Sequence, residues 1–186
     1  MDLGSIKLNG FDVYLFGTPG LLQFSVMRDV IVSGADGIIF MFDAAQPEKD
    51  VDAITILNSI RDILEPNQPF VFLANKQDIK EARSHEVIRA QNKLQKNVKI
   101  FPSSTKTGLN VQESLKYLVN EIYENYSSLL QILRSFESNI EGLAKKLKKD
   151  KVQMKDFLNS LEIKRFIEID RINRTYRVRE GLKSII

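Results

Sequence analysis

Two short apolar runs constrain the fold of this chain more than any other feature. Residues 37–43 read GIIFMFD, and residues 69–74 read PFVFLA. Strands that are apolar at nearly every position, rather than at alternate ones, are typical of sheets buried on both faces, and such sheets are mostly parallel. The sequence therefore predicts a buried sheet with helices on both sides.

Helical patterns alternate with strand patterns through the first two thirds of the chain. This order predicts an α/β fold with a mostly parallel sheet, whose ligands bind beyond the carboxyl ends of the strands. An Asn9-Gly10 dipeptide predicts a hairpin turn between the first two strands. The expected helices lie at about 22–33, 51–64 and 84–94 and from 111 onward, and the expected strands at 5–8, 12–16, 37–43, 69–74 and 98–101.

A polar cluster directly after the second apolar run predicts a specific chemistry. Asn75, Lys76 and Asp78 follow the pattern N-K-x-D at the expected end of a strand. Guanine presents two adjacent N–H donors, and the carboxylate of Asp78 could accept both in a charge-assisted bidentate pair. Adenine presents an acceptor at the same place, so the carboxylate would repel it. By itself the pattern is equally typical of a polar turn after a strand.

Composition excludes several classes of function. The chain has no Cys, so disulfides, thiolate metal sites and a Cys nucleophile are excluded. Its single histidine, His85, lies in a polar stretch, which disfavours a histidine metal centre or a Ser-His-Asp triad. No apolar run reaches the roughly 18 residues that a membrane span needs. The first five residues lack the features of a signal peptide.

Four segments match the Ras-like small GTPases in order and spacing. Residues 16–20 (FGTPG) resemble the switch II motif, and residues 75–78 (NKQD) resemble the guanine-specificity motif. Residues 104–106 (STK) resemble the loop that contacts the base through backbone N–H groups, and residues 1–5 (MDLGS) resemble the strand after the switch I threonine. The segment 1–124 is similar in particular to the archaeal and bacterial group whose middle motif reads F-G-T-P-G.

The resemblance implies a P-loop GTPase-like domain with GTP or GDP as its cofactor. Asp78 would bind guanine, Lys76 and Asn75 would shape the base pocket, and Gly20 would approach the γ-phosphate through its N–H. No catalytic residue and no metal ligand are identified, and Mg²⁺ is expected only if a phosphate-binding loop is supplied. The predicted nucleotide-binding residues are Gly20, Asn75, Lys76, Asp78, Ser104, Thr105 and Lys106.

The sequence departs from the family pattern in its phosphate-binding features. The loop G-x-x-x-x-G-K-(S/T) does not occur in the printed sequence, and the switch I threonine is also missing. Leu21 stands where a water-orienting Gln usually follows the glycine, so slow GTP hydrolysis is expected even from a complete protein. We favour the interpretation that this truncated domain is a fragment. The alternative is a degenerate relative that closes its sheet differently or borrows a strand from a partner.

Residues 125–186 predict a small second domain. Three helices followed by two alternating strands resemble a winged helix-turn-helix domain, in which residues 141–147 (EGLAKKL) look like the second helix and the third helix would be the recognition helix. The expected helices lie at 126–136, 138–147 and 152–166, and the expected strands at 166–170 and 175–178.

The predicted function is a cytoplasmic guanine-nucleotide switch that signals through the C-terminal module. We expect that module to bind a protein effector or to self-associate. DNA is the alternative partner, because Lys151, Lys155 and Arg174 could contact phosphates, although Asp150 and Asp156 dilute the charge. Membrane contact is not expected. Two other classes stay open: a DNA-binding transcription regulator with a GTPase-like scaffold, and a nucleotide-free pseudo-GTPase used for assembly.

Overall fold

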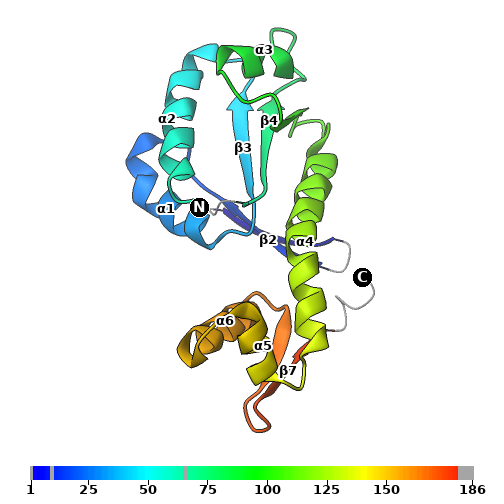
Figure 1. Cartoon of the computed structure of the whole chain (residues 1–186). Coiled ribbons are helices and arrows are strands. Elements are labelled where there is room, and N and C mark those ends of the chain that lie inside the picture. Colours follow the sequence, from blue (N-terminus) through cyan, green and yellow to red (C-terminus); the bar gives the residue numbers. More distant parts are fainter. Residues whose placement is uncertain (1, 9–10, 65–66, 180–186) are drawn as a thin grey trace. The chain divides into compact units, whose positions relative to one another are not determined.

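The computed structural model describes residues 2–8, 11–64 and 67–179 (Figure 1). The predicted Asn9-Gly10 turn lies outside the described residues. Contacts divide the chain into two compact units, one made of Met1–Ser5 with Tyr14–Tyr123 and the other of Ile6–Val13 with Glu124–Ile186. Among the helices in the described ranges, none combines the length and apolar character that crossing a bilayer would require.

The elements follow the predicted alternation of strands and helices. In the first two thirds of the chain they are β1 (Asp2–Leu8), β2 (Phe11–Gly17), the 3-10 helix η1 (Leu22–Phe24), α1 (Ser25–Gly34), β3 (Ile38–Asp43), the 3-10 helix η2 (Pro47–Lys49), α2 (Asp50–Arg61), β4 (Phe70–Asn75), α3 (His85–Gln91) and β5 (Lys99–Pro102). They are followed by α4 (Val111–Ser135), α5 (Ile140–Leu147), α6 (Lys151–Ile163), β6 (Ile167–Asp170) and β7 (Thr175–Val178).

The two apolar runs form neighbouring strands of one parallel sheet. β4 lies between β3 and β5, and both pairs are parallel, with Ile38 opposite Phe70 and Val71 opposite Lys99. The α/β fold with a parallel sheet is therefore confirmed. In register, Asp43 at the end of β3 lies opposite Asn75 at the end of β4, so the polar ends of the strands meet at one edge of the sheet.

Side chains that alternate between the faces of the sheet build two cores. On one face, Phe42 and Phe72 pack in a buried cluster with Leu57 of α2 and Ile88 of α3. On the other face, the core contains Val71, Leu73 and Leu118. Figure 1 shows α2 and α4 on opposite sides of β3 and β4. Helices therefore cover both faces of the β3-β4-β5 sheet, as the sequence predicted.

A glycine allows α4 to approach the beginning of β3. A Cβ atom on Gly37 would lie 2.9 Å from Cδ1 of Ile122 and 3.0 Å from Cδ1 of Leu118. Both distances are shorter than ordinary carbon contacts, which are about 3.5–4.0 Å. A larger residue at this position would therefore have to displace side chains of α4.

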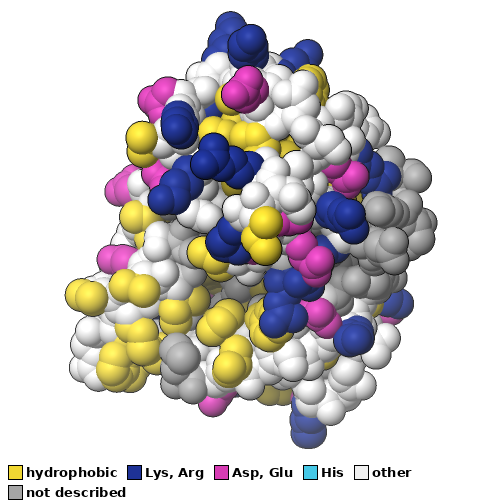
Figure 2. Space-filling view, turned by 90° about the horizontal axis from the view of Figure 1, so that it is seen from below, with side chains coloured by type: hydrophobic (Ala, Val, Ile, Leu, Met, Phe, Trp, Pro, Cys, Tyr) yellow, Lys and Arg dark blue, Asp and Glu magenta, His cyan; other side chains and the backbone are white. Residues whose placement is uncertain are grey.

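β1 and β2 form a two-stranded sheet of their own and are not part of the β3-β4-β5 sheet. Apolar side chains near the unpaired edges are exposed: Phe16 is 51% exposed and Met41 is 47% exposed. Such edges are usually protected in stable sheets. The face drawn in Figure 2 also carries a group of exposed hydrophobic side chains.

A predicted helix boundary near residue 125 is wrong, and the helix expected over 152–166 is α6, which already ends at Ile163. We expected one helix to begin at residue 111 and a separate one to span 126–136, but α4 is continuous from Val111 to Ser135. Its apolar stripe keeps a helical period from Leu118 through Ile122, Leu129 and Leu133, and neither Gly nor Pro interrupts it. The polar residues near 124 and 125 lie on the helix and do not end it.

The unit that contains residues 124–186, here called the C-terminal unit, has its own core. The end of α4, the helices α5 and α6, and the hairpin of β6 and β7 contribute to it. Leu130 and Leu133 of α4 belong to one buried cluster with Leu143, Leu158 and Tyr176. Two helix starts in this unit are capped by side chains that the sequence places there. Asn139 accepts a hydrogen bond from the N–H of Gly142, and Asp150 forms a capping box with Gln153. The strands β6 and β7 pair antiparallel.

Candidate functional site

The carboxyl ends of the three parallel strands carry the predicted binding residues. The loops that follow them are joined by main-chain hydrogen bonds: the N–H of Ala44 donates to Asn75 O (3.0 Å), and the N–H of Gln77 donates to Ser103 O (3.0 Å). Because parallel strands end at the same edge, residues distant in the sequence become neighbours here. Three loops therefore form one connected polar edge.

Asn75 ties the loop after β4 to the loop after β5. Its side-chain oxygen accepts the N–H of Thr105 (3.0 Å), and its amide nitrogen donates to the hydroxyl of Thr105 (3.4 Å). Asn75 is only 7% exposed, so its polar atoms must be paired inside the protein. Asn75 therefore joins these two loops, and its part in a base pocket stays a prediction.

Lys76 is held by a carboxylate at the end of the neighbouring strand. Its Nζ lies 2.8 Å from Oδ2 of Asp43, while Oδ1 of Asp43 accepts the N–H of Ala45. Burial raises the pKa of the Asp43 carboxyl, but the bonds from Lys76 and Ala45 outweigh burial and leave the pKa below its ordinary value. Lys76 also has a positive φ of 72°, a conformation in which a non-glycine residue is uncommon. Its side chain is thus fixed in direction.

Asp78 is fixed and kept ionised by the loop after β5. The hydroxyl of Ser104 donates to Oδ1 of Asp78 at 2.6 Å, and Nζ of Lys106 lies 3.9 Å from Oδ2. The hydrogen bond from Ser104 is the main cause that lowers the pKa of Asp78. The Asp78 side chain is 14% exposed, and Ser104 is fully buried. The result is a pre-oriented carboxylate that can accept N–H donors.

The loop after β5 is itself closed by short-range bonds. Ser104 O accepts the N–H of Gly108 (2.8 Å), and Ser104 Oγ accepts the N–H of Thr107 (3.2 Å). Gly108 adopts a φ of +83°, which favours glycine. Ser104 also bridges to Leu109. Residues 104–106 are therefore presented on a tight turn.

The structure brings together six of the seven predicted residues. Gly20 is the exception: among the described residues, no hydrogen bond or ion pair joins it to the others, and a Cβ placed on it would have no neighbour within 4 Å. Its neighbours Pro19 and Leu21 are instead held by Arg28, whose guanidinium donates to their carbonyls at 3.1 and 2.7 Å. Asn75 contacts Thr105, and Asp78 contacts Ser104 and Lys106. Lys76 lies in the same loop as Asn75 and Asp78 but pairs with Asp43.

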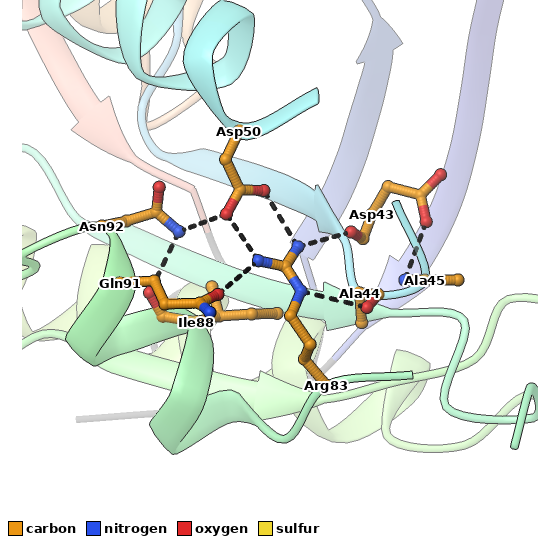
Figure 3. Close-up of polar contacts among 8 residues, drawn as sticks. All are labelled: Asp43, Ala44, Ala45, Asp50, Arg83, Ile88, Gln91 and Asn92. Carbon is orange, nitrogen blue, oxygen red and sulfur yellow. Dashed lines mark hydrogen bonds and ion pairs between the residues drawn. The ribbon is translucent and has the colours of Figure 1, made fainter. Parts of the chain in front are cut away.

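Sequence reasoning missed a network beside this edge, drawn in Figure 3. Arg83 binds Asp50 of α2 and the main chain at the end of β3, and Asn92 also donates to Asp50. Nothing in the local sequence pattern marked Arg83, because Asp50 and the end of β3 are more than thirty residues away from it. In the parts of the chain that the structure describes, no group of three or more His, Asp or Glu residues is arranged to hold a metal ion.

The parallel α/β domain with a carboxylate, a lysine and a buried asparagine at its carboxyl edge defines a class of nucleotide-binding domain. The comparison with known families agrees: a model described as "Ras family" matches residues 5–124. The chain belongs to the Ras family, and these residues form its small-GTPase domain.

Relatives of this domain occur in eukaryotes and bacteria. The chain is 28% identical over 127 residues to Ras-related protein RabZ of Dictyostelium discoideum, covering 67% of this chain and 56% of that protein. It is 29% identical over 131 residues to Ras-related protein Rab-7b of Mus musculus, covering 68% and 62%. It is 25% identical over 122 residues to the mutual gliding-motility protein MglA of Myxococcus xanthus, covering 62% of each. The chain thus spans less than two thirds of the length of these relatives.

Proposed function

We propose that this chain binds guanine nucleotides and supplies the part of the site that recognises the base. The observation that carries the proposal is the carboxylate of Asp78, which Ser104 holds at 2.6 Å and which is kept ionised. It lies in the same loop as Lys76, whose direction is set by Asp43. A fixed carboxylate accepts the paired N–H donors of guanine and disfavours adenine, while Lys76 can cover the base with its alkyl stem.

Tight binding of the phosphates would require a phosphate-binding loop. Residues 1–186 contain no G-x-x-x-x-G-K-(S/T) loop, whose N–H groups and lysine bind phosphates and whose hydroxyl binds Mg²⁺. We therefore expect weak, base-directed binding by this chain alone and tighter, Mg²⁺-dependent binding when such a loop is supplied. Leu21 cannot orient a water molecule, so we propose that any GTP hydrolysis is slow.

Equilibrium binding of a fluorescent GDP analogue, with competition by unlabelled GDP and ADP, tests this function. The unmodified chain is expected to prefer GDP to ADP, and Asp78→Asn is expected to abolish that preference. Asp52→Asn removes an exposed carboxylate from α2 and serves as the matched control. A second protein carries a strand and phosphate-binding loop ahead of Met1 and is measured with and without Mg²⁺. Unchanged base selectivity of Asp78→Asn in both proteins would overturn the assignment.

For the C-terminal unit we propose a winged-helix-like module that contacts a protein partner or a second copy of the chain. Three helical segments followed by the β6–β7 hairpin support this reading. The apolar side chains of Ile163 and Ile172 are 81% and 92% exposed, at the end of α6 and in the turn of the hairpin. Exposed apolar residues at such positions fit a protein contact.

Nucleic acid is the second candidate for this unit, and a separate observation favours it. Within the described residues, several exposed lysines of α5 and α6 have no ion-pair partner, whereas Arg171 is paired with Glu162 at 2.6 Å. On the face drawn in Figure 2, however, basic side chains are interspersed with acidic ones. These exposed lysines are Lys145 and Lys146 of α5, Lys148 directly after it, and Lys151 and Lys155 of α6.

Two measurements on the whole chain separate these candidates. Sedimentation reports self-association, and Ile172→Asp should weaken it. Binding to a labelled 20-base-pair duplex over a salt series reports phosphate contacts, because the slope of log affinity against log salt scales with the number of phosphates neutralised. Lys145→Gln with Lys151→Gln should reduce that slope, and Lys96→Gln is the control. A monomer that shows neither effect would leave a contact with a different protein as the surviving proposal.

A further inference from the structure

Arg83 has a guanidinium group whose N–H donors are all used. Nε donates to Ala44 O (3.2 Å), and Nη2 donates to Asp43 O (3.0 Å) and to Oδ1 of Asp50 (3.0 Å). Nη1 donates to Oδ2 of Asp50 and to Oε1 of Gln91, both at 2.7 Å. Figure 3 shows the guanidinium directed at the end of β3 and the start of α2. Only a planar fork can make these five bonds together, so lysine is not an equivalent.

The partner carboxylate is fixed as firmly as the arginine. Oδ2 of Asp50 also accepts a hydrogen bond from Nδ2 of Asn92 at 2.7 Å. The side chains of Arg83 and Asp50 are 12% and 13% exposed. Paired and hydrogen-bonded charges at this degree of burial hold a defined geometry rather than a mobile surface contact.

Hydrogen bonds and an ion pair connect Arg83 by two routes to residues 76–78, the loop after β4 that is proposed to bind the base. On the first, the N–H of Arg83 donates to Ala44 O (2.9 Å), while its own carbonyl accepts Nε2 of Gln77 (2.9 Å). Gln77 stands between Lys76 and Asp78, so its side chain anchors the middle of that loop. On the second route, Arg83 holds the main chain of Asp43, whose carboxylate holds Lys76. The first route ends on Gln77, between two residues proposed to contact the base, and the second ends on Lys76 itself.

We propose that Arg83 is a positioning residue for base selectivity. Arg83 touches neither base nor phosphate in this scheme and acts by fixing Gln77 and Asp43, which in turn fix Asp78 and Lys76. The inference rests on the proposed guanine-nucleotide site, but the bonds that carry it exist without nucleotide. The network therefore sets the selectivity between bases more than the affinity for the phosphates.

The test compares Arg83→Lys with Arg61→Lys in the whole chain. Arg83→Lys keeps the charge and loses the fork, whereas Arg61 is exposed, and its closest partner is Asn58 at 3.5 Å. The first readout is the ratio of GDP to ADP affinity, which a loss of general stability would not change in a protein that stays folded. We expect this ratio to fall at least tenfold in Arg83→Lys and to stay unchanged in Arg61→Lys. An unchanged ratio in Arg83→Lys would overturn the proposal.

A second readout keeps the proposal testable if the chain binds no nucleotide. Amide hydrogen exchange of residues 76–82 is expected to be at least tenfold faster in Arg83→Lys, with residues 71–74 of β4 unchanged. If the unmodified chain fails to bind GDP, the proposed function fails while this readout still reports on the positioning. Equal exchange of residues 76–82 in both variants would refute the positioning role, whatever the binding result.

Discussion

Two parts of the molecule are held in different ways. One part is the pair of loops after β4 and β5, and the other is the segment after β2. Asn75 is 7% exposed and Ser104 fully buried, and each bonds to the neighbouring loop. In the segment after β2, Leu21 is 61% exposed, and the side-chain anchor is Arg28. The proposed base side of the site is therefore pre-organised by bonds between its loops, whereas the segment after β2 is held by the side chain of Arg28.

The largest change in the free energy of unfolding should come from replacing Arg83, which braces the loops after β3 and β4. Arg83→Ala leaves the carboxylate of Asp50 without its charged partner in a site where its side chain is 13% exposed. Removing one member of a buried pair is strongly destabilising, so the free energy of unfolding should fall by about 3 kcal/mol. Urea unfolding followed by circular dichroism measures this change.

Arg61→Ala is the control for that experiment, because Arg61 is exposed on α2. Its free energy of unfolding should change by less than about 0.5 kcal/mol. If both variants unfold at the same urea concentration as the unmodified chain, the loops after β3 and β4 are not braced by Arg83, and the contrast with the segment after β2 disappears.

A smaller effect should appear as a pH dependence of stability. Burial raises the pKa of Asp50, but the bonds from Arg83 and Asn92 outweigh burial, so the pKa lies below its ordinary value. A carboxyl whose pKa is lowered by folding stabilises the protein above its unfolded pKa, and this contribution is lost as pH falls through the folded pKa. The unmodified chain should therefore lose stability more steeply than Asp50→Asn from about pH 5 downward.

Urea unfolding at a series of pH values measures the two slopes. Asp52→Asn, an exposed carboxylate change on the same helix, should retain the slope of the unmodified chain. Parallel curves for Asp50→Asn and the unmodified chain would show that the Asp50 pair adds no pH-dependent stability.

Replacing Arg28 is expected to have the smallest effect on the free energy of unfolding. Its main consequence should be local, in the segment after β2. Arg28 is 3% exposed, and its guanidinium bonds to carbonyls of Pro19, Leu21 and Leu22. Within the described residues it has no carboxylate partner, so replacing it by Met removes three bonds but also removes a buried charge. We expect Arg28→Met to change the free energy of unfolding by less than about 1 kcal/mol.

Amide exchange of residues 18–24 should nevertheless become at least tenfold faster in Arg28→Met, while residues 75–78 keep their protection. Exchange measured by mass spectrometry on the same sample resolves both segments. Equal protection of residues 18–24 in the two proteins would mean that contacts other than Arg28 hold this loop.

Several parts of the fold could be predicted from the sequence for local reasons. The strands β3 and β4 could be predicted because a short, continuous apolar run is typical of a strand that is buried on both faces. Helix starts at Ser84, Asn139 and Asp150 follow from side chains that accept main-chain N–H groups within the next turn. The continuity of α4 was missed because two polar residues were read as a boundary, although its apolar period continues across them.

By itself, the sequence determined the order of strands and helices and the N-K-x-D cluster at the end of β4, since both depend on residues close together in the chain. Only the tertiary structure decided that Ser104 holds Asp78, that Asp43 holds Lys76, and that Arg83 connects these loops to α2. These contacts join residues 26 to 33 positions apart. No local pattern encodes them, because parallel strands align their ends in space whatever the length of chain between them.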